Sequence, residues 1–234
     1  MKLLAKYLLI LVVVMTFWNT VIIKPLKLFA VVLHELGHAF MAFIFGYGIS
    51  SFNIRLNESG FVIAKSKGWF SSFMIANGGY LGSVLFALFI LYLSRTFLKK
   101  YIIGIFAIIF LLLAFLYSGI SATLFYSIIF TTLVILVYMI DNNQIHEWII
   151  DIIGVSSIAY AIYDIVIDTI FLEINSKFHL ISWNKNILTD AQVLAKMTYI
   201  PAIVWGLIWL LLSIIAIKVV LFNRKFKGKK KYGG

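Results

Sequence analysis

Runs approaching twenty apolar residues recur along the whole chain, and a helix of that length crosses the hydrocarbon core of a bilayer. Hydrophobic residues make up 63% of the 234 positions, more than a water-soluble domain of this size could keep from water. The sequence therefore predicts an all-α, multi-pass membrane protein with about seven transmembrane helices. The apolar runs lie near residues 4–23, 26–46, 70–93, 101–117, 120–140, 147–172 and 200–221.

Two stretches interrupt this pattern. Residues 49–68 alternate apolar and polar side chains around the turn-like NESG, which predicts a small β-hairpin between the second and third helices. Phe52, Ile54 and Leu56 would share one face of its first strand. Residues 173–199 are polar and end in LTDAQVLAKM, which predicts a short amphipathic helix capped by Thr189 or Asp190. The chain is interpreted as one membrane-embedded domain, residues 1–234.

The positive charge is concentrated at the end of the chain. The net charge is +11, and much of it lies in the tail NRKFKGKKKYGG, from about residue 222. A basic segment beside a membrane helix favours a cytoplasmic location and contact with anionic lipid, rather than with nucleic acid. We therefore expect a multi-pass protein, of the cell membrane, with a cytoplasmic C-terminus.

A short motif in the second apolar run carries the chemistry. Residues 34–38 read HELGH, an HExxH sequence. On a helix His34 and His38 lie on one face, where both imidazoles can bind one Zn²⁺. Glu35 is then placed to act as the catalytic base on a water molecule. Ionisable residues at membrane depth are expensive, so their presence indicates a function.

A catalytic zinc usually has three protein ligands, and the chain has no cysteine to offer. Among the carboxylates of the sixth run, Asp164 and Asp168 lie on one helix face, and Asp164 is nearer mid-span. Asp164 is the favoured third ligand, with Asp168 as its support or as a proton relay. The reverse assignment, a structural role for either one, and the weaker candidates Glu58 and His179 stay open.

The motifs resemble those of the site-2 protease family of intramembrane zinc metalloproteases. HELGHA at residues 34–39 is similar to that family's first zinc-binding motif, although the usual second motif is absent. NGGYLGS at 77–83 and YDIVIDT at 163–169 resemble elements of a smaller, M50B-type branch. The resemblance implies a zinc-dependent peptidase that cleaves within or near transmembrane segments of other membrane proteins.

The residues leave room for other interpretations. Asn77 would donate to a substrate carbonyl or its oxyanion, and Gly78, Gly79 and Gly82 would let two helices pack tightly. A non-catalytic, pseudoprotease-like binder of membrane proteins or of metal is the main alternative, but zinc binding alone does not require Glu35. A prenyl-protein processing enzyme would share only the HExxH motif.

Overall fold

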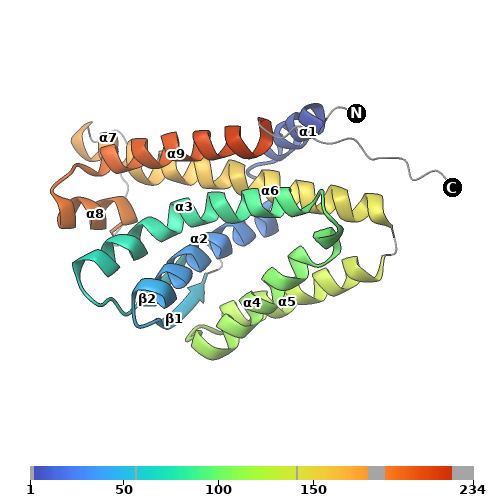
Figure 1. Cartoon of the computed structure of the whole chain (residues 1–234), viewed down its shortest axis with the longest axis horizontal. Coiled ribbons are helices and arrows are strands. Elements are labelled where there is room, and N and C mark those ends of the chain that lie inside the picture. Colours follow the sequence, from blue (N-terminus) through green and yellow to red (C-terminus); the bar gives the residue numbers. More distant parts are fainter. Residues whose placement is uncertain (1–2, 56, 141, 179–187, 223–234) are drawn as a thin grey trace.

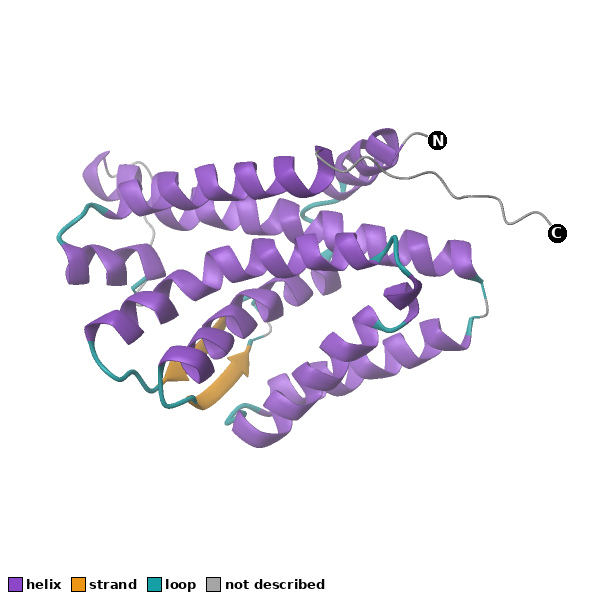
Figure 2. Cartoon of the chain, viewed as in Figure 1, coloured by secondary structure: helices purple, strands orange, loops and turns teal. Residues whose placement is uncertain are grey.

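The computed structural model describes residues 3–55, 57–140, 142–178 and 188–222, and most of them are helical (Figure 1). The helices lie side by side in a bundle, with a two-helix hairpin on one side (Figure 2). The longer helices are α1 (Leu3–Thr16), α2 (Lys24–Phe45), α3 (Trp69–Leu93), α4 (Ile102–Tyr117), α5 (Ser121–Met139), α6 (Asn143–Ile165) and α9 (Ala202–Phe222). A π-helical segment (Val166–Phe171) and α7 (Leu172–Phe178) continue α6, and α8 (Asp190–Thr198) precedes α9.

All seven apolar runs are helices, which confirms the predicted fold class. Five are long and apolar enough to cross a membrane: α2, α3, α5, the continuous helix from Asn143 to Asn175, and α9. Helices α1 and α4 are apolar but shorter. The first is shorter than predicted because residues 17–23 form turns, where the Thr20 hydroxyl donates to the Phe17 carbonyl. The basic tail from residue 223 onward lies outside the described residues, so its lipid contact and orientation stay predictions.

Glycines bring α2 and α3 unusually close together. A Cβ on Gly82 would lie 2.8 Å from the Cα of Gly37, and one on Gly78 would lie 2.7 Å from the Gly37 carbonyl oxygen. Real side chains do not tolerate such distances to backbone atoms, so only hydrogen fits at the crossing. The packing role predicted for Gly78 and Gly82 follows from these distances, and it brings α3 against the HExxH face of α2.

The predicted β-hairpin is present between α2 and α3. Strand β1 (Ile49–Ile54) pairs antiparallel with β2 (Gly60–Ala64), and Ile54 lies opposite Gly60. Phe52 and Ile54 are fully buried, as expected for one face of the strand. Leu56, predicted on the same face, lies outside the described residues.

The outer side of β1 is attached to the α4–α5 hairpin. The Thr123 hydroxyl of α5 accepts a hydrogen bond from Ile54 N, 2.9 Å, and donates one to the Ile54 carbonyl, 3.1 Å. At the link between the two helices, Gly119 N donates to Asn53 Oδ1 over 3.1 Å. These bonds give partners to the buried side chains of Asn53 and Thr123 and to the backbone of Ile54, and a buried polar group without a partner is costly.

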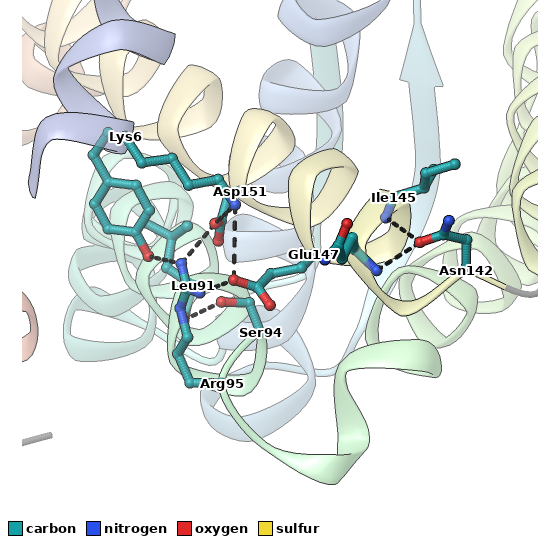
Figure 3. A network of polar contacts seen from close by, with 10 residues as sticks. Lys6, Leu91, Ser94, Arg95, Asn142, Ile145, Glu147 and Asp151 are labelled. Atoms are coloured by element: carbon teal, nitrogen blue, oxygen red, sulfur yellow. Dashed lines mark hydrogen bonds and ion pairs between the residues drawn. The ribbon is translucent and has the colours of Figure 1, made fainter. Parts of the chain in front are cut away.

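A cluster of four charged side chains ties α1 to α3 and α6 near the N-terminal end of α6 (Figure 3). Lys6 Nζ lies 2.7 Å from Asp151 Oδ2, and Arg95 Nη2 lies 2.6 Å from the same oxygen. Arg95 also pairs with Glu147, and Asp151 is completely buried. We call Lys6, Arg95, Glu147 and Asp151 the ionic cluster. One carboxylate of the sixth apolar run, that of Asp151, therefore has a structural role.

Candidate metal centre

The HExxH motif lies in the middle of α2, and its two histidines point to one place. His34 Nε2 and His38 Nε2 are 3.1 Å apart, and the ring centroids are separated by 4.8 Å. This is the convergence that a spacing of four residues on a helix predicts. Both side chains are largely buried, so the two nitrogen atoms meet inside the protein, not on its surface.

The carboxylate that meets them is Asp190. Its Oδ2 lies 3.2 Å from His34 Nε2 and 3.1 Å from His38 Nε2. Within the described part of the chain, these three residues form the one group of three or more possible metal-binding side chains whose ligand atoms all lie within 4.8 Å of one another. The sequence led us to expect Asp164 or Asp168 at this place, and the structure brings Asp190 of α8 there. Which aspartate binds a metal ion stays a prediction.

The N-terminal cap of α8 does not use the Asp190 side chain, which leaves that carboxylate available for this contact. Thr189 caps the helix: its hydroxyl accepts from Gln192 N, while Thr189 N donates to Gln192 Oε1. This reciprocal pair is a capping box, and it satisfies the helix end without the next side chain. Asp190 is then the first helical residue, and its carboxylate faces the histidines. Of the two caps predicted, Thr189 is confirmed.

Helix α8 is fixed against the bundle by apolar packing. Ala191 and Leu194 are fully buried in a cluster that includes Tyr80 of α3 and Trp209 of α9. At the other end, Trp69 Nε1 donates to the Met197 carbonyl over 3.1 Å. Because the apolar face of α8 is buried, its first residue has a defined position beside α2.

The predicted ligands Asp164 and Asp168 lie near the centre but outside it. Asp168 lies in the π-helical segment, 3.5 Å from the Tyr80 hydroxyl. The Tyr80 ring in turn packs edge-on against His34, with centroids 4.7 Å apart. Asp168 thus lies next to a tyrosine whose ring contacts His34; the supporting or relay role predicted for Asp168 stays a prediction. Asp164 is half-buried in α6.

Hydrogen bonding sets the state of His38. Its Nδ1 lies 2.8 Å from the Ile75 carbonyl, which can only accept, so this nitrogen carries the proton. In the neutral ring, Nε2 then directs a lone pair toward His34 Nε2 and the Asp190 carboxylate. Three atoms that can each donate a lone pair to a metal ion, His34 Nε2, His38 Nε2 and an Asp190 carboxylate oxygen, therefore lie close together.

The geometry fits a zinc ion. A tetrahedral centre with bonds of about 2.0–2.1 Å separates its ligand atoms by about 3.4 Å. The three separations found here are 3.1, 3.1 and 3.2 Å. Gly79 keeps the space open, because a Cβ there would lie 2.5 Å from His34 Nε2 and nearer still to His38 Nε2. Gly79, which the sequence predicted to help two helices pack, therefore also leaves room beside the two histidine nitrogens.

Glu35 lies beneath the β-hairpin. It is 5% exposed, and a Cβ on Gly60 would lie 2.7 Å from its Oε1. The turn of the hairpin is held by Glu58, whose carboxylate lies 3.4 Å from Lys27 Nζ and whose carbonyl accepts from the Tyr160 hydroxyl. Glu58 is thus paired with a lysine, and His179 lies outside the described residues.

Asn77 is held by its neighbours on α3 and α9. Its Nδ2 donates to the Phe73 carbonyl, 2.9 Å, and its Oδ1 accepts from Trp209 Nε1, 2.8 Å. One amide hydrogen is left for a further acceptor. Its predicted contact with substrate stays a prediction.

Residues 7–220 match the protein family described as Peptidase M50B-like, which is most of the chain. The chain belongs to this M50B-like peptidase family. No curated protein and no solved structure matches it. The resemblance drawn from the sequence is thereby confirmed. Peptidases of the M50 type are typically zinc-dependent, and membership indicates a membrane-embedded metallopeptidase.

Sequence reasoning pointed to three residues of this candidate centre and did not point to Asp190. His34, Glu35 and His38 stand in a recognisable motif, whereas Asp190 stands in a polar segment between two apolar runs. A signal was present, because Thr189 and Gln192 already form a complete capping box. The adjacent aspartate was therefore not needed as a cap.

Proposed function

We propose that the chain is an intramembrane zinc metalloprotease that hydrolyses peptide bonds within or near transmembrane segments of other membrane proteins. The observation that carries this proposal is the meeting of Asp190 with both histidines of an HExxH helix, where His38 is buried and His34 and Asp190 are half-buried. His34, His38 and Asp190 would hold Zn²⁺, in place of the Asp164 set expected from the sequence.

The side chains divide the work of hydrolysis. Bound there, zinc would act as a Lewis acid on the substrate carbonyl and lower the pKa of a water molecule. Glu35 takes a proton from the attacking water and delivers it to the leaving amine. The Ile75 carbonyl keeps His38 in one tautomer, and the Tyr80 ring limits rotation of His34. Burial of Glu35 excludes bulk water from the reaction.

The β-hairpin offers a place for an extended substrate. Strand β1 is occupied by β2 on one side and by Thr123 on the other. Among the described residues, no third strand pairs with β2. A substrate segment unwound from its helix would add to β2 by backbone hydrogen bonds. Since β2 begins at Gly60, beside Glu35, a strand added there would run past the catalytic base.

A non-catalytic binder would need the same fold and the same metal ligands but not Glu35. The experiment that separates the two uses full-length protein in vesicles, with a panel of synthetic transmembrane peptides whose helices contain glycine or asparagine. Mass spectrometry of the peptides would report internal cleavage. We expect cleavage by the wild type and a loss of about 10²–10⁴-fold in Glu35→Gln, the usual contribution of a general base.

Zinc content serves as the control in that experiment. The Glu35→Gln protein should retain its metal, because Glu35 is not a ligand in the proposed set. Equal cleavage by the two proteins would contradict the proposed mechanism. Retention of zinc and peptide binding, with no cleavage by the wild type, would favour the binder.

A further inference from the structure

A cavity on the other side of the molecule has no part in the proposed hydrolysis. It has a volume of about 280 Å³ and lies between the N-terminal half of α2, the end of β1, and the α4–α5 hairpin. We propose that it binds one acyl chain of a phospholipid, with the lipid phosphate at Lys24. The residues that form its walls include Leu28, Val32, Ile54, Phe110, Phe130 and Leu133.

The walls of the cavity fit a hydrocarbon and not water. Its lining is apolar apart from Lys24 and the hydroxyl of Tyr126. A cavity without several polar partners does not hold ordered water. An apolar cavity of about 150 Å³ accommodates one benzene molecule. At about 280 Å³, this cavity has room for a part of one acyl chain.

The cavity also has the direction of a lipid tail. Lys24 is the first residue of α2, and Val32 lies eight residues further along the helix. At a rise of 1.5 Å per residue, this distance is about 12 Å. The cavity therefore runs from the end of a membrane-spanning helix toward its middle. The outer wall is α5, a candidate span with only 11% of its apolar window buried, so most of its apolar surface is left for contact with lipid.

Lys24 supplies a charge that suits a phosphate group. The neighbouring Lys27 is paired with Glu58 and lies over the Trp18 ring. No ion pair within the described residues involves Lys24, which is half-buried at the cavity. A lysine at the end of a membrane helix, beside an apolar slot, matches the two halves of a phospholipid.

The position of the cavity separates it from the peptide substrate. Val32 precedes His34 by two residues, so the two side chains leave α2 on nearly opposite sides. The cavity thus lies across the helix from the metal ligands. A lipid there would fill the space between α2 and α5 without entering the metal centre.

Native mass spectrometry of the full-length, delipidated protein provides the test. The probe is a phosphatidylglycerol, compared with a diacylglycerol that lacks the phosphate. We expect one phosphatidylglycerol retained per chain and a loss of about tenfold in Ile129→Trp, which fills the cavity. Leu136→Trp is the matched control, since it lies on the exposed face of α5 and does not line the cavity. Equal retention by both variants would overturn the proposal.

The headgroup is tested separately. Lys24→Gln should weaken phosphatidylglycerol binding by about fivefold and leave diacylglycerol binding unchanged, the size expected for one lysine near an anionic headgroup. Lys99→Gln, in the short helix after α3, is the matched control. If both variants bind like wild type, the phosphate is not at Lys24.

A measurement on the wild type alone covers the case in which Ile129→Trp does not fold. A phospholipid with a photoreactive group in its acyl chain should label residues 24–32 and 126–133. Labelling confined to exposed helix faces would overturn the proposal. Labelling of these segments that an added transmembrane peptide removes would assign the cavity to the substrate instead.

Discussion

Two groups of charged and polar residues lie inside this bundle, and they differ in whether the charges within each group balance one another. The ionic cluster contains two cations and two carboxylates, and its charges neutralise one another. The candidate metal centre contains two imidazoles and the carboxylate of Asp190, with no lysine or arginine within hydrogen-bond distance among the described residues. Both lie among apolar helices, where an unbalanced charge is costly. This difference is the reason that we interpret the first group as structural and propose that the second binds a metal ion.

The comparison also explains why Asp151 and Asp190 have different roles. Asp151 is fully buried and receives Lys6 and Arg95 on one oxygen. Its charge is balanced by the chain itself. Among the described residues, the side chains found within ion-pair distance of Asp190 are His34 and His38, and we propose that a metal ion balances its charge. The sequence shows both as single aspartates near apolar runs.

The largest effect on stability should come from breaking the complete cluster. In Asp151→Ala, Lys6 loses its closest partner, and Arg95 keeps Glu147 and the Tyr7 hydroxyl. Removing one member of a buried ion pair typically costs about 3–5 kcal/mol. Thermal unfolding in detergent should show a correspondingly lower midpoint, while the folded fraction retains zinc. A midpoint equal to that of wild type would mean that the ionic cluster is not structural.

The next effect concerns the space at the metal centre. In Gly79→Ala, the new Cβ would occupy the position next to both Nε2 atoms. We expect the zinc affinity and the rate of peptide cleavage to fall by about 100-fold, because displacing the groups that hold a metal lowers its affinity strongly. The midpoint of thermal unfolding should change little. Gly104→Ala is the control, because a Cβ there meets nothing within 4 Å. Equal behaviour of the two variants would contradict the geometry of the centre.

The smallest effect should follow from Tyr80→Phe. This change keeps the ring against His34 and removes only the hydroxyl near Asp168. A single hydrogen bond is typically worth about 1 kcal/mol, and this one is long. We expect full zinc content and a cleavage rate within about fivefold of wild type. A loss as large as that of Gly79→Ala would give the hydroxyl, and with it Asp168, a direct part in the reaction.

Much of this structure could be predicted from the sequence because it depends on local patterns. Apolar runs give the helices, alternation around NESG gives the hairpin, and HELGH gives three residues of the centre. The aspartate that lies beside the two histidines could not be predicted in the same way. Asp151, Asp164 and Asp168 look alike on an apolar helix, and only the fold pairs Asp151 with Lys6. Likewise, only the packing of α8 brings Asp190 to α2.

The zinc content of the purified protein, in the wild type and in two aspartate variants, tests the central claim most directly. We expect about one zinc per chain in the wild type and in Asp164→Ala, and almost none in Asp190→Ala, as a three-ligand catalytic site requires. Zinc retained by Asp190→Ala but lost from Asp164→Ala would contradict the assignment made here. A wild type that binds no zinc after reconstitution would contradict the metal centre itself.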